Sequence, residues 1–284
     1  MKNGFIIVNY NDYVTTKELI DNIKNYKIID EIVVVDNCSK DNSFEELKKI
    51  KCKKLSVIQN SANKGYASGL NFGAKYLIEK YKECNLVFSN ADIVIYNEKD
   101  LKKLIEDLNE NKNYGIVAPI IKEHTGYSKG WKLPTPFQDS VLNIIGIHRF
   151  LRPKMLFYKD NYFKGKVKVD VILGCFFLMN SKILEDVDFF DENTFLFYEE
   201  NIMSKKLQGK NYDVIIDSDV EVFHNHSVTI DKNVQKINKL KMLKTSQFYF
   251  QKNYNKANKF EMALLKITAK TTIFLLSIYY KIKG

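Results

Sequence analysis

The chain has 284 residues, 45% of them hydrophobic, and carries a formal net charge of +10. This length and apolar share suit one large α/β domain or two smaller ones with a real core. The four cysteines show no CxxC or Cys-His spacing, which argues against a zinc site and against disulfides and favours reduced, cytosolic thiols. The first apolar run, GFIIVN, is too short for a signal peptide.

The body of the chain alternates short strands with helices. GFIIVN and EIVVVDN are apolar and rich in β-branched residues, as in strands covered on both faces of a parallel sheet, and residues 15–26 between them have helical spacing. The alternation continues with helices expected at 43–50, 67–81 and 98–110 and strands at 54–59, 85–90 and 114–119. Repeated βα units predict an α/β fold with a doubly wound, mostly parallel sheet flanked by helices.

Polar residues stand where the predicted strands end. Asn9, Asp36, Asn60 and Asn90 all occupy such positions. Ligands of doubly wound sheets bind outside the carboxyl ends of the strands. We therefore expect these four residues to share one binding edge.

Residues 120–166 are less regular, and glycines and prolines interrupt them. We expect an insertion or variable loop there, with a helix near 139–151. Regular order resumes with KVDVILGCFFLMNS, a helix from Lys182, and a segment that ends in DVEVFHNHS.

The positive charge belongs to the C-terminal tail. Residues 230–284 hold twelve lysines and two acidic residues, so 12 − 2 = +10 and residues 1–229 are neutral overall. We predict two units, 1–229 and 230–284, and an anionic partner for the second, either nucleic acid or a membrane surface. Its last helix has an uncharged run of ten residues, 271–280, whereas a spanning helix needs about 20. The pattern favours a basic amphipathic helix in the membrane interface, and the alternative is a helix packed on the body's own core.

Two motifs suit a nucleotide. Asp36 follows a buried strand and could accept a hydrogen bond from a base or ribose, although a strand-end or helix-capping role is the simpler alternative. Asn63, Gly65 and Asn71 lie between a strand and a helix, where small residues let a phosphate approach backbone N–H groups. Neither GxGxxG nor GxxxxGK[ST] is present, so this second motif is weak by itself.

Three acidic positions and two histidines suit the chemistry of a diphosphate. Asp92 offers the hard oxygen that Mg²⁺ or Mn²⁺ prefers, or else belongs to a strand-end turn. Glu199 and Glu200 begin a helix after an aromatic loop, where they could supply a general base or simply favourable helix-dipole electrostatics. His224 and His226 are two residues apart, and His224 could complete a metal shell or hold a diphosphate.

Taken together, these motifs resemble the family-2 inverting glycosyltransferases with the GT-A fold, and within them the rhamnosyltransferase-like branch that builds bacterial surface polysaccharides. The similarity spans roughly residues 4–232 and rests on these segments: IIVNYN, IVVVDNCSKDNS, NKGYASGLNFGAKYL, FSNADI, VILGCFFLMNSKIL, FDENTFLFYEENIMSKKL and VEVFHNHSVT.

The resemblance implies a role for each matching position. Residues around the nucleobase would be Val8, Tyr10, Asn11 and Asp36, and those near the ribose and diphosphate would be Asn63, Lys64, Gly65 and Asn71. Asn90, Ala91 and Asp92 stand at the family's Asp-x-Asp or Asn-x-Asp motif, with His224 at its late histidine. Glu200 stands at the catalytic base, with Glu199 beside it. Only Asp92 of the metal motif is a carboxylate, and the acidic pair is Glu-Glu instead of Glu-Asp.

The resemblance also implies partners and a location. Residues 1–229 would bind a nucleotide-sugar, dTDP-rhamnose or a UDP-hexose, with Mg²⁺ or Mn²⁺, and transfer the sugar with inversion to a glycan or lipid-linked glycan. The tail would hold the enzyme on the anionic inner face of the cell membrane, and no nucleic acid is expected to bind.

Three other functions fit less well. A sugar-phosphate nucleotidylyltransferase needs a basic, glycine-rich opening loop, which IIVNYNDY lacks. A nicotinamide-dependent dehydrogenase needs GxGxxG after its first strand. A non-catalytic basic nucleic-acid-binding protein would explain the tail but not the acidic strand ends, which repel phosphates in the absence of a metal.

Overall fold

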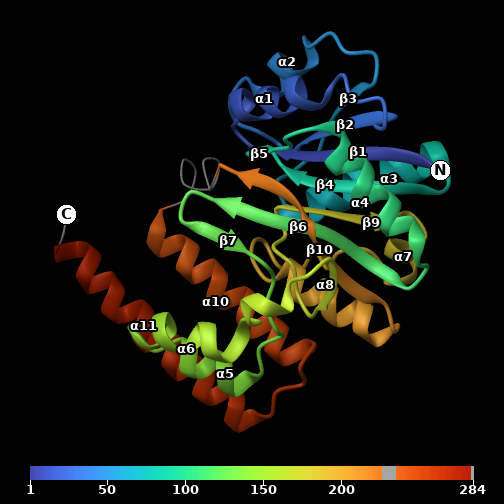
Figure 1. Ribbon diagram of the computed structural model, residues 1–284. Coiled ribbons are helices and arrows are strands. Elements are labelled where there is room, and N and C mark those ends of the chain that lie inside the picture. The colour runs from blue at the N-terminus through green and yellow to red at the C-terminus, as the bar shows by residue number, and fades with distance from the viewer. Residues whose placement is uncertain (226–234, 283–284) are drawn as a thin grey trace.

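The structure is a computed structural model that describes residues 1–225 and 235–282. A mixed sheet runs through its centre in the strand order β3-β2-β1-β4-β9-β6-β10-β5, while β7 pairs with β6 and β8 with β10 (Figure 1). Helices cover both faces of this sheet, as Figure 1 shows. The predicted α/β class, with a central sheet flanked by helices and a C-terminal helical extension, is confirmed.

The N-terminal half contains the expected βα units. Its parallel strands are β1 (Lys2–Asn9), β2 (Glu31–Asp36), β3 (Leu55–Gln59) and β4 (Cys84–Asn90). Its helices are α1 (Tyr13–Ile23), α2 (Ser43–Lys48), α3 (Tyr66–Tyr81) and α4 (Glu98–Glu110). Every residue of β2 is buried, because apolar clusters pack against both faces of the sheet, as the continuous apolar run predicts.

The second half adds antiparallel pairs to the sheet. Its strands are β5 (Ile93–Val94), β6 (Tyr114–Glu123), β7 (Gly126–Ser128), β8 (Lys166–Val169), β9 (Phe176–Asn180) and β10 (Asp213–His224). Strand β9 lies antiparallel between β4 and β6, whereas β10 runs parallel to β6. Two further helices, α7 (Ser181–Asp186) and α8 (Glu199–Gly209), follow β9.

The irregular segment forms two helices where the sequence predicts one near 139–151. They are α5 (Pro136–Leu142) and α6 (Ile147–Leu156), followed by a 3-10 turn, η1 (Asp160–Tyr162). Thr135 and Gln138 form a capping box that starts α5. Gly146 separates the helices with a φ of +82°, a left-handed conformation that glycine adopts without strain.

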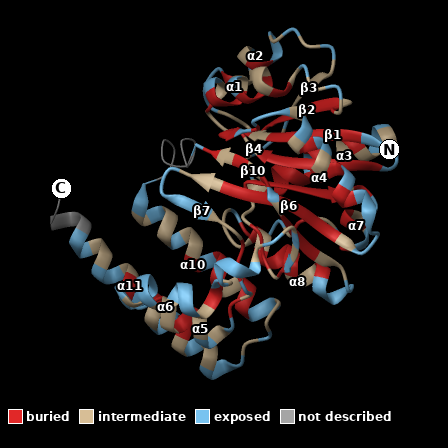
Figure 2. Ribbon diagram, viewed as in Figure 1, coloured by how far each residue is buried: buried red, intermediate tan, exposed pale blue. Residues whose placement is uncertain are grey.

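The C-terminal extension consists of α10 (Lys236–Asn253) and α11 (Lys259–Ile282). Helix α11 packs against α5 and α10, and α5 packs against α6, below the sheet (Figure 1). Phe250, Leu265 and Ala269 are fully buried, whereas much of α11 is exposed along its length (Figure 2). The tail therefore contacts the body through one side and leaves the rest of α11 uncovered.

One segment of α11, Lys259–Tyr279, is long and apolar enough to cross a membrane, judged by length and composition among the described residues. Of the residues in its most apolar stretch, 17% are buried. Core helices of soluble proteins reach the same length and composition, so this observation alone does not place α11 in a membrane.

Candidate active site

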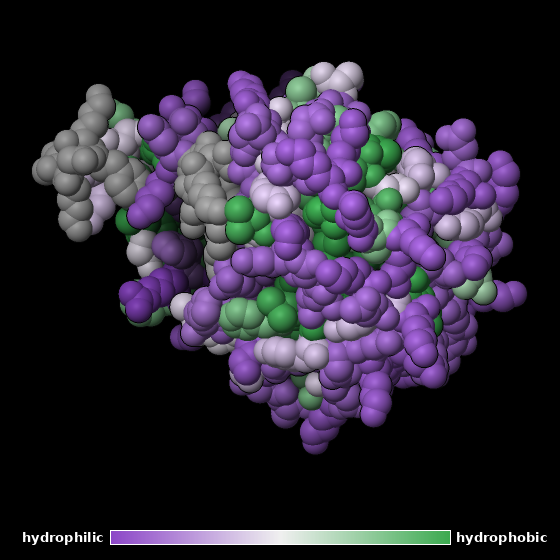
Figure 3. Space-filling view, turned by 90° about the horizontal axis from the view of Figure 1, so that it is seen from above, coloured by the Kyte–Doolittle hydropathy of each residue, from purple (hydrophilic) through white to green (hydrophobic). Residues whose placement is uncertain are grey.

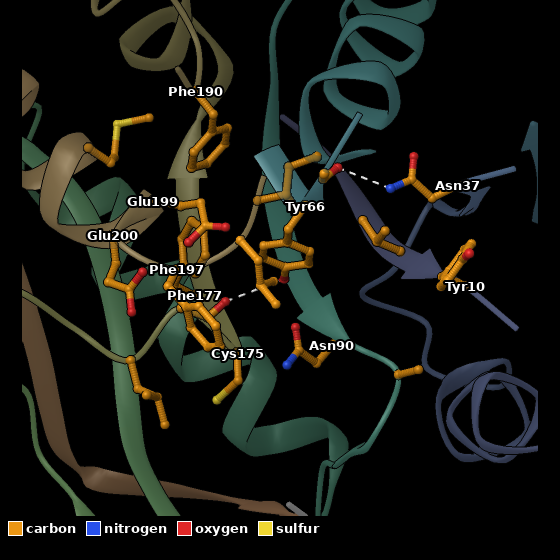
Figure 4. Close-up of a pocket in the computed structure, with 18 of the residues that line it drawn as sticks. Tyr10, Asn37, Tyr66, Asn90, Cys175, Phe177, Phe190, Phe197, Glu199 and Glu200 are labelled. Carbon is orange, nitrogen blue, oxygen red and sulfur yellow. Dashed lines mark hydrogen bonds between the residues drawn. The ribbon is translucent and has the colours of Figure 1, made fainter. Parts of the chain in front are cut away.

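The carboxyl ends of β1, β2 and β4 meet at one edge of the sheet. In the strand register, Asn9 of β1 lies opposite Asp36 of β2, and Val8 of β1 lies opposite Asn90 of β4. A first cavity of about 450 Å³ opens at this edge. The predicted site residues that line it are Val8, Tyr10, Asn63, Gly65, Asn90, Ala91, Asp92, Glu199, Glu200 and His224. Figure 4 shows Tyr10 and Asn37 at one end and Glu199 and Glu200 at the other.

Four other predicted residues do not line this cavity. Asp36 is fully buried, and its carboxylate accepts hydrogen bonds from Asn9 Nδ2 at 2.9 Å and from Gln59 Nε2 at 3.0 Å. Asn71 is also buried and exchanges two hydrogen bonds with the backbone of Phe190, each 2.9 Å long. These two residues therefore order the walls of the site from behind.

The remaining two, Asn11 and Lys64, lie beside the cavity. Asn11 Oδ1 accepts a 2.7 Å hydrogen bond from the backbone N–H of Lys40, which fixes the loop after β2. Lys64 is exposed. Asn37, which the sequence did not single out, lines the cavity and donates hydrogen bonds to the residues on either side of Lys64.

Gly65 brings the loop before α3 close to the aromatic loop before α8. Its φ is +105°, and a Cβ at this position would lie 2.3 Å from the carbonyl oxygen of Phe195. The N–H of Tyr66 donates to that same carbonyl at 3.0 Å. Asn37 Nδ2 donates to Gly65 O at 3.0 Å and to Asn63 Oδ1 at 3.1 Å. Only glycine fits this contact, which closes the first cavity on one side.

The candidate metal ligands meet where β4 and β10 end. His224 Nε2 lies 3.2 Å from Asp92 Oδ1, and His224 Nδ1 lies 3.3 Å from Glu123 Oε1. Burial lowers the pKa of His224, but the hydrogen bond and charge of Asp92, and then those of Glu123, outweigh burial and raise it. Within residues 1–225 and 235–282, no group of three or more His, Cys, Asp and Glu side chains has the arrangement of a metal site. His226 lies outside the described residues.

Glu199 and Glu200 are the first residues of α8, directly after two residues in the left-handed region. Phe197 and Tyr198 have φ values of +72° and +70°, which for such side chains is strained backbone of the kind found at functional sites. Burial and then the charge of Glu200 raise the pKa of Glu199 to about 8. Burial also raises the pKa of Glu200, and the positive charge of Arg152 opposes that rise.

A second cavity of about 960 Å³ adjoins the first. The two cavities share Glu123, Leu173, Phe197 and Glu200, whereas Glu199 lines only the first. Helices α5, α6, α10 and α11 all contribute side chains to its remaining wall. Glu200 therefore lies at the junction, with access to both spaces.

A match to a protein-family model shows to which family the chain belongs. The model of glycosyl transferase family 2 matches residues 5–188, which is more than half of the chain. The chain belongs to glycosyl transferase family 2. The match runs from β1 through α7, so the glycosyltransferase's acidic pair, His224 and C-terminal helices lie beyond it.

Among curated proteins, this glycosyltransferase is 26% identical over 225 residues to the low-salt glycan biosynthesis hexosyltransferase Agl10 of Haloferax volcanii. That alignment covers 79% of this chain and 67% of the relative.

Two solved structures share the fold. The GalNAc-T7 structure with UDP, GalNAc and Mn²⁺ has a TM-score of 0.61 at 14% identity, and the match covers 81% of this chain but only 44% of that one. The Pyrobaculum calidifontis mannosyltransferase PcManGT, in complex with GDP-Man and Mn²⁺, has a TM-score of 0.61 at 15% identity, with 98% and 75% covered. These similarities confirm the GT-A fold of this glycosyltransferase.

Sequence reasoning missed several residues of the glycosyltransferase's cavity wall. Glu123 lies at the end of β6, four residues beyond the predicted strand. The apolar run IVAPII continues past Pro119, and that continuation could have revealed the longer strand. Gly174 faces Glu200, and a Cβ there would lie 3.8 Å from Glu200 Oε2. No local pattern marks this contact, because it joins segments far apart in the sequence.

Proposed function

We propose that this glycosyltransferase transfers a sugar, with inversion, from a nucleotide-diphosphate donor to a hydroxyl of a glycan acceptor. The position of Glu200 between the two cavities is the observation that carries the proposal. A donor in the first cavity and an acceptor in the second would meet at this carboxylate. The pair of adjoining cavities thus suits a reaction between two substrates.

The donor's nucleotide would occupy the end of the first cavity near Val8, Tyr10 and Asn37. Asn63 and Gly65 would lie near the ribose and diphosphate, where the loop before α3 offers a close backbone approach. Asp36 would act indirectly, by holding Asn9 and the loop at Ser39 through hydrogen bonds. A UDP-hexose and dTDP-rhamnose both remain donor candidates.

Asp92 and His224 are the residues that would hold Mg²⁺ or Mn²⁺. One carboxylate and one imidazole fit a cation whose other ligands are phosphate oxygens and water, because Mg²⁺ and Mn²⁺ sites commonly use few protein ligands. The Mn²⁺ in the two structural relatives supports this assignment. Such an ion, when bound, supplies positive charge to the departing diphosphate. Asn90 and Ala91 would position Asp92 at the end of β4.

Glu200 would be the general base. The acceptor oxygen forms its bond to the anomeric carbon as the bond from that carbon to the diphosphate oxygen breaks, and the hydroxyl proton passes to Glu200. The raised pKa of this half-buried carboxylate favours proton uptake. A single displacement inverts the anomeric centre. Glu199 does not reach the second cavity, which favours Glu200 over its neighbour.

The acceptor is proposed to be a growing glycan on a lipid carrier. The relative that acts in glycan biosynthesis supports the glycan, and the lysine-rich tail with the exposed apolar side chains of α11 supports a membrane surface. We propose that residues 1–229 form the catalytic domain and that residues 230–284 bring it to the anionic inner face of the cell membrane.

A thermal-shift panel of UDP, GDP and dTDP sugars, each with and without Mn²⁺, tests the donor site. A binding nucleotide sugar raises Tm, and Mn²⁺ increases that rise. Transfer to an acceptor, followed by determination of the product's anomeric configuration, tests inversion. Absence of stabilisation by any nucleotide would contradict the proposed donor site, and a retained anomeric configuration would contradict the single displacement.

A further inference from the structure

The inner end of the second cavity holds a buried lysine. Lys244 of α10 is 7% exposed, and its ammonium donates a hydrogen bond to Asn143 Oδ1 at the end of α5. No carboxylate lies within ion-pair distance of this ammonium in the described part of the chain, since no salt bridge involves Lys244. Burial accordingly lowers the pKa of Lys244 to about 8, against the attraction of Asp139.

The nearest acidic side chain is committed to other partners. Asp139 accepts hydrogen bonds from Tyr198 Oη at 2.9 Å and Gln251 Nε2 at 2.6 Å. A buried cation without an ionic partner is costly, because the interior solvates charge poorly. Lys244 therefore lines the second cavity as a cation that an anionic ligand would stabilise.

Two further side chains in the same wall each have one buried polar atom without a hydrogen-bond partner among the described residues. Asn143 is 3% exposed and its Nδ2 has no hydrogen-bond acceptor among the described residues. Gln247 is 4% exposed, and no donor in that part of the chain reaches its Oε1. Both side chains line the cavity. Buried polar groups in native proteins are normally satisfied, so these atoms point to a ligand with both acceptor and donor groups.

Helix α6 adds positive charge to the lining of the same cavity. Arg152 lines the second cavity, lies 5.7 Å from the ring centroid of Phe157, and forms no salt bridge with any described residue. Its charge acts on both Glu200 and Lys244, so the proposed base and the buried lysine both lie within its electrostatic reach. Lys129 also lines the cavity but pairs with Asp160 at 3.0 Å, so Lys244 and Arg152 are the lining cations that remain for a ligand, together with the amide donor of Asn143.

Part of the lining of this cavity is apolar. Ile145 and Phe157 line it and are exposed, and Leu276 of α11 lines it and is half-buried. On the same two helices, Phe150 of α6 is 71% exposed and Phe274 of α11 is 64% exposed. The face of the molecule seen from above, by contrast, is mostly hydrophilic with small separate apolar patches (Figure 3). Cations next to exposed apolar side chains suit an amphiphile, a molecule with an anionic head and a hydrocarbon chain.

We propose that the second cavity binds the phosphate of a lipid-linked acceptor, held by Lys244, Asn143 and Arg152, while the lipid chain lies along α6 and α11. This inference rests on the proposed function, because it assigns the acceptor's class to the acceptor side of the same site. Phosphate oxygens satisfy the ammonium, the guanidinium and the amide at once. A sugar hydroxyl beyond the phosphate would donate to Gln247 Oε1.

Binding of three probes to the intact protein tests this inference without requiring turnover. The probes are dodecyl phosphate, inorganic phosphate and dodecyl maltoside, each below its micellar concentration and measured by calorimetry. Dodecyl phosphate is expected to bind at least about tenfold more tightly than either of the others. Equal affinity for inorganic phosphate would refute a binding site for the lipid chain. Equal affinity for the maltoside would refute a binding site for the phosphate.

Variants locate the site. Arg152→Gln and Lys244→Gln should each weaken dodecyl phosphate binding at least about tenfold, while Arg149→Gln, an exposed arginine of α6 outside the cavity lining, should leave it unchanged. Arg152 is exposed, so its variant tests the inference even if Lys244→Gln folds poorly. UDP binding in the first cavity is measured on the same variants and should be unchanged. Failure of the wild type to bind UDP would instead refute the proposed function. Dodecyl phosphate binding that neither variant weakens would refute this inference.

Discussion

The carboxylate of Asp92 and the imidazole of His224 lie 3.2 Å apart, although 132 positions separate them in the sequence (224 − 92 = 132). Strand β5 pairs with β10 and brings them together, since His224 is opposite Ile93 in the register. The loop after β4 and the end of β10 thus form one side of the proposed diphosphate site.

Asp92→Asn should therefore weaken metal use. The amide removes the negative charge of the proposed ligand, so the Mn²⁺ concentration for half-maximal transfer is expected to rise at least about tenfold. Mn²⁺ binding measured by electron paramagnetic resonance with UDP present should weaken in parallel. Asp219→Asn, which alters an exposed acid on β10, is the control. Full activity of the wild type in excess EDTA would contradict the assignment.

Glu200→Gln should lower kcat by about 10²–10⁴, the usual contribution of a general base. Affinity for the nucleotide sugar should change little, because the amide keeps the shape of the side chain. Glu199→Gln is the matched control, with a smaller loss of kcat expected. If the two variants exchanged these effects, Glu199 would be the base.

Glu199 should make stability depend on pH. Its pKa of about 8 in the folded protein exceeds the ordinary glutamate pKa of 4.5, so unfolding becomes easier as pH rises from about 4.5 to about 8 and the buried carboxyl ionises. Glu199→Gln removes this penalty, which is on the order of a few kcal/mol. Its Tm should exceed that of the wild type by more at pH 8.5 than at pH 5. A Tm difference that is the same at both pH values would show that Glu199 titrates normally.

Gly65→Ala should disrupt the donor cavity. The new methyl group would lie 2.3 Å from Phe195 O, and the φ of +105° is unfavourable for alanine. A destabilisation of at least about 1–3 kcal/mol is expected, measured by denaturant unfolding, together with loss of UDP binding. Gly209→Ala is the control, since a Cβ there meets nothing within 4 Å.

Exposed apolar residues of α11 should contribute to membrane binding. Ile267 and Phe274 are 63% and 64% exposed, and replacing both with serine should lower binding to anionic liposomes at least about tenfold. Phe72→Ser, on α3, should leave binding unchanged. Binding of the wild type should also weaken in high salt, because the tail is rich in lysine. Liposome binding that neither salt nor these substitutions reduced would exclude α11 as the contact.

The sequence predicted the βα units, and most of the predicted site residues line the first cavity. Helix α4 has the bounds expected from its periodicity, and both glutamates begin α8 as expected. The pattern did not predict the place of β9 between β4 and β6, because apolar alternation specifies a strand but not its neighbours. For the same reason Asp36 and Asn71 could not be recognised as buried supports: their partners, such as Phe190, lie far away in the sequence.

The hydrogen bonds that join α10 to the aromatic loop bear on how this enzyme could be recombined with its relatives. Ser246 Oγ donates to Leu196 O at 2.8 Å, and Tyr249 and Tyr254 both donate to Asp191 Oδ2. A chimaera that exchanged only the C-terminal helices would break these bonds beside the strained turn at Phe197 and Tyr198. A functional chimaera would therefore need residues 190–198 and the C-terminal helices from the same protein, so that the contacts that orient the acidic pair are kept.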